Sequence, residues 1–133
     1  MNTGNRTNEK RILLIEDEPT YRLLMLTVLR KAGFHCSFCV NGDQAIQKLA
    51  QEAFDLTIID YVLPGPNAID IVRWMRTQKI NTPALIMTNY PSDDISTKIK
   101  ALTKTKLIPK PTFDPANMPA IIQEMFASQG SIL

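Results

Sequence analysis

Acidic, hydroxyl and lysine side chains recur in this sequence directly after short apolar runs. In chain order they are Glu16, Asp17, Asp60, Thr88 and Lys110. Carboxylate oxygens are ligands that Mg²⁺ prefers, and a carboxylate beside such a cation can attack phosphorus. A lysine can pair with one phosphoryl oxygen, and a threonine hydroxyl can donate to another. Together these residue types predict metal-assisted phosphoryl transfer, provided that the fold brings them to one place.

The elements that must position them are short apolar runs alternating with stretches of helical pattern. The runs of strand length are Ile12 to Ile15, Phe34 to Val40, Leu56 to Ile59, Ala84 to Met87 and Leu107 to Ile108. Strict alternation of strand and helix predicts an α/β fold, with a doubly wound five-stranded parallel sheet and five helices on its two faces. In such a sheet all strands end at one edge, so the residues that follow them should meet there.

Start and stop signals delimit the helices. The first is expected to begin at Pro19 and end near Gly33, and the second to follow Asn41. The third carries an apolar stripe from Ile69 to Met75. The fourth begins at Ser92, followed by two aspartates, and ends among lysines, which suits the helix dipole. The last is expected to start near Asn117 and to end at Ala127.

Charge crowding supports a binding site at that edge. Like charges about 5 Å apart, at an effective dielectric near 20, repel by roughly 3 kcal/mol, so neighbouring carboxylates cost stability unless a cation offsets them. Taken singly, a strand-end Asp or Thr more often caps a helix or a turn. The coincidence at four of five strands favours the functional interpretation.

Size and composition suit one domain. The chain has 133 residues, of which 44% are hydrophobic. We expect a disordered leader over 1–10, the domain over 11–127 and a loose tail over 128–133. The formal net charge of +2 is too small to indicate nucleic acid or a membrane surface as a partner. Cys36 and Cys39 are the only cysteines. They should face opposite sides of one strand, so they predict no zinc site, and a reducing cytoplasm is the expected setting.

The motifs ILLIEDEP, LTIIDYVLPG, ALIMTNY and LIPKP, in this order and spacing, resemble the receiver domain of two-component response regulators over Arg11 to Ala127. The resemblance implies a flavodoxin-like strand order, 2-1-3-4-5. It also implies a residue set for the site. Asp60 would be the phosphoacceptor, Thr88 the switch hydroxyl and Lys110 the invariant lysine, and the Mg²⁺ ligands would be Glu16, Asp17, Asp60 and the backbone carbonyl of Val62. The Lys110–Pro111 bond is often cis in the family.

This family membership would make the protein a signalling phosphoacceptor rather than an enzyme of the usual kind. The phosphoryl group would come from a phosphohistidine on a sensor histidine kinase or a histidine phosphotransfer protein. Phosphorylation would shift a two-state surface around the fourth helix, the fifth strand and the last helix, which a downstream effector would read. Direct contact with nucleic acid or a membrane is not expected.

Three alternatives compete with this interpretation. A phosphohydrolase of the haloacid-dehalogenase type needs a second Asp two residues after the first, where this chain has Val62. A flavodoxin-like cofactor binder would place phosphate beside Glu16, Asp17 and Glu18, which would repel it. The strongest is a degenerate receiver that binds partners without phosphorylation, because Leu107 replaces the family's usual Tyr or Phe and Asn89 its usual small residue.

Overall fold

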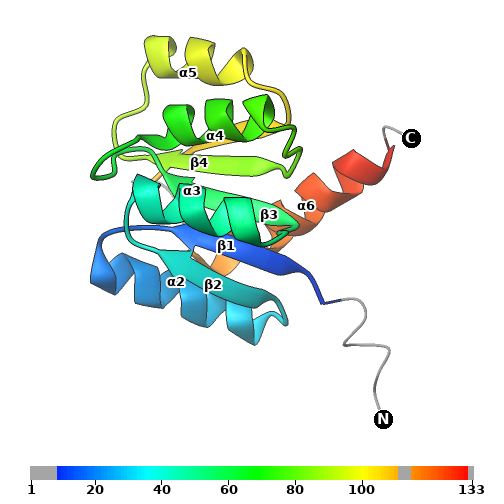
Figure 1. Cartoon of the computed structure of the whole chain (residues 1–133). Helices are drawn as coiled ribbons and strands as arrows, with labels where there is room; N and C mark the ends of the chain where they lie inside the picture. Colours follow the sequence, from blue (N-terminus) through cyan, green and yellow to red (C-terminus); the bar gives the residue numbers. More distant parts are fainter. Residues whose placement is uncertain (1–8, 111–114, 132–133) are drawn as a thin grey trace.

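A single parallel sheet organises the chain. The computed structural model describes residues 9–110 and 115–131. The strands are β1 (Arg11–Ile15), β2 (His35–Cys39), β3 (Leu56–Asp60), β4 (Ala84–Thr88) and β5 (Thr105–Pro109). They pair in the order β2-β1-β3-β4-β5, and every pair is parallel (Figure 1). The predicted fold class and strand order are therefore confirmed.

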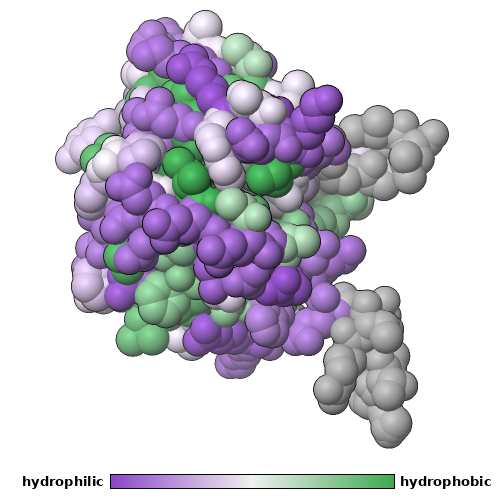
Figure 2. Space-filling model, viewed as in Figure 1, coloured by the Kyte–Doolittle hydropathy of each residue, from purple (hydrophilic) through white to green (hydrophobic). Residues whose placement is uncertain are grey.

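Helices cover both faces of the sheet. They are α2 (Pro19–Lys31), α3 (Gly42–Gln51), α4 (Ala68–Thr77), α5 (Asp93–Lys100) and α6 (Met118–Ser131), with a 3₁₀ turn, η1 (Pro115–Asn117). Helices α3, α4 and α5 pack on one face and α2 and α6 on the other, each with its own apolar cluster. Figure 2 views the side of α3, α4 and α5, where mostly hydrophilic side chains cover the surface with small apolar areas between them.

Side chains that alternate along each strand contribute to the two apolar clusters in turn. In β1, Leu13 and Ile15 join the cluster under α3 and α4, whereas Ile12 and Leu14 join the one under α2 and α6. All four are fully buried. Because the sheet is covered on both faces, its central strands are mainly apolar on both sides. Apart from the buried Thr57, the polar side chains of β1, β3 and β4 lie at the strand ends.

The helix starts follow the capping signals. Asn41, Asn67 and Ser92 each accept a hydrogen bond from a backbone N–H in the first turn of α3, α4 and α5. Pro19 occupies the first position of α2, as predicted. The described part of the chain contains no helix long and apolar enough to cross a membrane.

The C-terminal helix corrects one prediction. Helix α6 continues through Ser131, whereas a loose tail was expected from residue 128. Gly130 disfavours a helix by about 1 kcal/mol relative to alanine, but it does not force a stop, and each residue added to an existing helix gains a backbone hydrogen bond. Residues 132–133, most of the expected leader (1–8) and the bond between Lys110 and Pro111 lie outside the described residues; Glu9 and Lys10 are exposed and have no regular structure.

The cysteines and the histidine behave as expected. Cys36 belongs to the cluster under α2, and Cys39 to the cluster under α3. Both are buried free thiols on opposite faces of β2, and burial raises the pKa of Cys36 to about 11. His35 is exposed at the start of the same strand.

Candidate functional site

All five predicted site residues lie at the carboxyl edge of the sheet. Glu16 and Asp17 follow β1, Asp60 and Thr88 end β3 and β4, and Lys110 follows β5. The strand register brings these ends to the same height along the sheet, because Ile15 pairs with Ile59 and Asp60 with Met87. The structure brings the five together around one open cavity of about 330 Å³, which Val62 also lines.

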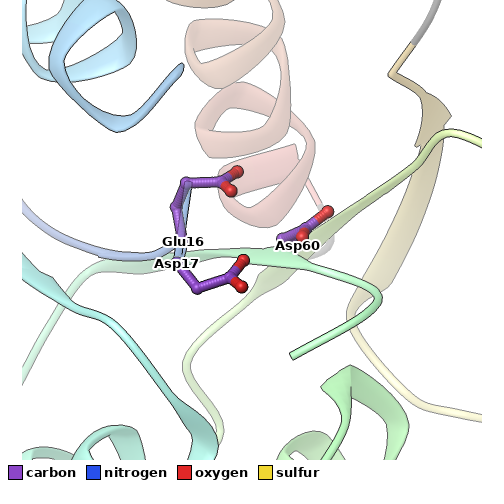
Figure 3. Close-up of side chains that lie close together, drawn as sticks. All are labelled: Glu16, Asp17 and Asp60. Atoms are coloured by element: carbon purple, nitrogen blue, oxygen red, sulfur yellow. The ribbon is translucent and has the colours of Figure 1, made fainter. Parts of the chain in front are cut away.

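Three carboxylates form the centre of the site. One oxygen from each of Glu16, Asp17 and Asp60 lies within 4.8 Å of the other two. Figure 3 shows Glu16 and Asp17 at the end of one strand and Asp60 on its neighbour, with the carboxylates facing the same space. Glu16 is fully buried and Asp60 is 8% exposed, whereas Asp17 is exposed. Two of the three acids are therefore held away from bulk water.

Among the described residues, one ammonium group, that of Lys110, pairs with this cluster. Lys110 Nζ lies 2.8 Å from Glu16 Oε1 and 3.4 Å from Asp60 Oδ1, and its side chain is only 10% exposed. The ring of Tyr21 lies on the same ammonium, with its centroid 4.2 Å from Nζ. The pairing leaves the centre with an excess of negative charge.

That excess appears in the pKa of Asp60. Burial, then the neighbouring charge of Glu16, raise this pKa from 3.8 to about 6, although Lys110 opposes the shift. In the protein alone, the ionised form of Asp60 is therefore less favourable than it would be in water. A bound cation would reverse this balance.

The donor set fits a small hard cation. Both oxygens of Glu16 are engaged, one by Lys110 and the other by the backbone N–H of Glu18 at 3.1 Å. Among the described residues the Asp17 carboxylate accepts no hydrogen bond, and Asp60 contacts Lys110 through Oδ1 alone. Two carboxylates with free oxygens, beside an open cavity that admits water, match the way Mg²⁺ is usually held. A part for the backbone carbonyl of Val62 stays a prediction.

Thr88 is fixed by the turn that follows β4. The side chain is 2% exposed. Its Oγ1 accepts a hydrogen bond from the backbone N–H of Tyr90 at 3.1 Å, and its carbonyl accepts one from the backbone N–H of Lys110. The hydroxyl proton remains available to an acceptor in the cavity.

Glu18 was expected at this acidic edge, but its capping of α2 and the part played by Tyr21 were not predicted from the sequence. Glu18 lines the cavity and caps α2, accepting hydrogen bonds from the backbone N–H groups of Tyr21 at 2.7 Å and Thr20 at 3.2 Å, which lower its pKa. The signal was present, since an acidic residue directly before Pro19 is typical of a helix start. The contact between Tyr21 and Lys110 had no comparable signal, because it joins residues far apart in sequence.

Comparison with known proteins decides the family. The model of the response regulator receiver domain matches residues 12–123. The chain belongs to the response regulator receiver domain family. The resemblance inferred from four motifs is confirmed.

Individual relatives agree with this assignment. The chain is 33% identical over 104 residues to Sporulation initiation phosphotransferase F of Bacillus subtilis, covering 78% of this chain and 83% of that protein. It is 33% identical over 84 residues to Transcriptional regulatory protein ResD of the same organism, covering 63% of this chain but only 35% of ResD. A receiver domain protein from Methanospirillum hungatei has the same fold, with a TM-score of 0.84 at 20% identity over 95% of this chain and 100% of that one.

Family and geometry together identify a receiver domain of two-component phosphorelay signalling. Members of the family are signalling phosphoacceptors rather than enzymes of the usual kind. The acidic cluster of this chain is compatible with a magnesium-binding phosphoacceptor site.

Proposed function

We propose that Asp60 accepts the phosphoryl group and that Glu16 and Asp17 help to hold the Mg²⁺ that this reaction needs. One observation carries the proposal: a lysine ammonium reaches between Glu16 and Asp60 at the centre of three converging carboxylates. Asp60 combines burial with an oxygen that Lys110 does not contact, and the cavity lies beside it. Glu16 is less suited to attack, because both its oxygens already accept hydrogen bonds.

The chemistry then follows from the positions of the side chains. A lone pair of one Asp60 carboxylate oxygen forms the new bond to phosphorus while the bond from phosphorus to the donor's imidazole nitrogen breaks. The electron pair of that broken bond returns to the imidazole. Lys110 pairs with one phosphoryl oxygen, and the Thr88 hydroxyl donates to another.

The metal ion would be held by Asp17, Asp60 and the backbone carbonyl of Val62, with Glu16 as a further acidic neighbour. When bound, Mg²⁺ supplies positive charge to the transferring oxygens. Glu16 also keeps Lys110 in place through the 2.8 Å ion pair, so its role is divided between metal and lysine. Asp17 is the exposed carboxylate of the three and lines the cavity, so an incoming ion would meet it first.

The donor and the readout follow from the family's signalling role. A sensor histidine kinase or a histidine phosphotransfer protein would supply the phosphoryl group, in the cytoplasm, where the free thiols of Cys36 and Cys39 would stay reduced. The surface of α5, β5 and α6 would shift and meet an effector. Leu107 is half-buried in the cluster under α4 and α5, so its packing is one route from Thr88 to that surface.

Intact mass after incubation with acetyl phosphate and Mg²⁺ tests the proposal. Wild type should gain one phosphoryl group, and neither a chelator-treated sample nor Asp60→Asn should gain any. If wild type gains nothing, and a fluoride analogue of phosphate with Mg²⁺ also fails to bind, the chain is a degenerate receiver that acts through protein contacts alone.

A further inference from the structure

The Lys110 ammonium is held on three sides. Glu16 and Asp60 contact it at 2.8 and 3.4 Å, and the Tyr21 ring centroid lies 4.2 Å from it. The longer of the two carboxylate contacts, to Asp60, is beyond the usual hydrogen-bond distance. The ring therefore supplies a substantial part of what keeps the ammonium beside the acceptor, because a cation over an aromatic face is attracted by the ring quadrupole.

Tyr21 is itself fixed to three elements. Its backbone N–H donates to Glu18 Oε1 at 2.7 Å, which anchors it in the first turn of α2. Its ring packs against the cluster under α2 and α6, and its hydroxyl lies 3.9 Å from Met87 Sδ, one residue before Thr88 on β4. The ring is therefore a fixed wall of the site, joining α2 to the ends of β4 and β5.

We propose that Tyr21 is a positioning residue for phosphoryl transfer, whose ring face holds the Lys110 ammonium at Asp60 while the lysine exchanges a carboxylate for a phosphoryl oxygen. This inference rests on the proposed function. Attraction to a ring face has little directional preference, so the ammonium can turn toward the incoming group without losing it. A hydrogen bond from the ammonium to a fixed acceptor would have to break for the same movement.

Two substitutions separate the ring face from the hydroxyl. Tyr21→Phe keeps the face and removes the contact with Met87, whereas Tyr21→Leu keeps apolar packing and removes the face. With acetyl phosphate and Mg²⁺, Tyr21→Leu should be phosphorylated about 5- to 30-fold more slowly than wild type, the range expected for a largely desolvated cation on an aromatic ring. Tyr21→Phe should restore the rate to within about twofold.

Readouts that do not depend on phosphorylation keep the test selective. The ε-methylene protons of Lys110 should show an upfield ring-current shift by NMR in wild type and Tyr21→Phe, and lose it in Tyr21→Leu. Mg²⁺ affinity should be equal in all three proteins, since Asp17 and Asp60 are unchanged, which also confirms that each variant is folded.

Each result has one meaning. A normal rate in Tyr21→Leu, an equally slow rate in Tyr21→Phe, or a missing ring-current shift in wild type would overturn the positioning role while leaving Asp60 as acceptor. If wild type itself gains no phosphoryl group, the proposed function fails and this inference fails with it.

Discussion

The two ends of the sheet are built on opposite electrostatic plans. At the amino end, Arg76 donates to the carbonyls of Ile80, Thr82, Thr103 and Lys104, at 2.8 to 3.4 Å. At the carboxyl end, three carboxylates share one ammonium. Charge at the amino end is matched by acceptors within the chain, whereas charge at the carboxyl end is matched only when a cation arrives. The arrangement at the amino end stabilises the fold. The arrangement at the carboxyl end lowers the stability of the metal-free protein and favours binding of a cation.

Arg11 is a second cation at the amino end whose charge is matched by acceptors within the chain. Arg11 pairs with Glu52 at 2.8 Å and donates to the Ala53 carbonyl, while its backbone N–H donates to Asp55. Lys48 adds a further contact to Glu52 at 3.1 Å. These contacts join the start of β1 to the segment that precedes β3. They therefore fix the two strands relative to each other at the end opposite the site.

Removing Arg76 should destabilise the amino end of the sheet and leave the metal site unaffected. Arg76→Ala leaves four carbonyls without their charged donor and should lower the free energy of unfolding by about 2–4 kcal/mol. Mg²⁺ should still stabilise the variant as much as it does wild type. Urea unfolding with and without Mg²⁺ measures both quantities. Arg73→Ala, an exposed arginine on the same helix, serves as control and should change stability by less than about 0.5 kcal/mol.

Gly42 offers the opposite test, at the carboxyl end. A Cβ at this position would lie 2.3 Å from the Pro66 carbonyl oxygen, in the loop that follows Asp60. Gly42→Ala should therefore cost about 1–3 kcal/mol and, unlike Arg76→Ala, should also reduce the stabilisation by Mg²⁺, because the displaced loop carries Val62. The exposed Gln47→Ala on the same helix is the control. Equal Mg²⁺ effects in Gly42→Ala and wild type would show that the loop does not contribute to the metal site.

Removing one carboxylate at the carboxyl end should stabilise the metal-free protein. In the presence of a chelator, Asp60→Asn should be more stable than wild type by about 1–2 kcal/mol, because it relieves the repulsion among three acids that share one cation. Asp17→Asn should gain less, since Asp17 is exposed. Added Mg²⁺ should raise the midpoint of thermal unfolding of wild type more than that of either variant. A less stable Asp60→Asn would mean that Lys110 already balances the cluster.

The smallest expected effect concerns a backbone position at the amino end. Lys104 has a φ of 53°, in the left-handed region that favours glycine. Lys104→Gly should raise the free energy of unfolding by about 1 kcal/mol. Lys106→Gly, within β5, should lower it by a similar amount, and chemical denaturation of both variants measures the two signs.

The sequence was sufficient for the features that depend on local pattern. Apolar runs and capping residues predicted every strand and helix, and the resemblance supplied the strand order. Asp60, Thr88 and Lys110 could be placed at one edge because parallel strands end together. The predicted end of α6 was wrong, because the helix continues past Gly130 to Ser131 although glycine disfavours a helix.

Features that depend on contacts between distant segments could not be predicted. The approach of Gly42 to Pro66 depends on how one loop lies on another. Likewise, the carbonyls that Arg76 contacts and the face of Tyr21 on Lys110 follow from packing, which no periodicity encodes. Nothing in the sequence indicated that Glu16 and Asp60 are buried while Asp17 is exposed, although all three were predicted as metal ligands.

The central claim is that Asp60, among three adjacent carboxylates, carries the phosphoryl group. Phosphorylated wild type, treated with borohydride to convert the acyl phosphate into a stable alcohol, can be cleaved after lysine and arginine. Residues 12–22 then carry Glu16 and Asp17, and residues 49–73 carry Asp60. We predict that the modification maps to Asp60 alone, within 49–73. Modification of Glu16 or Asp17 in the other peptide would contradict the account.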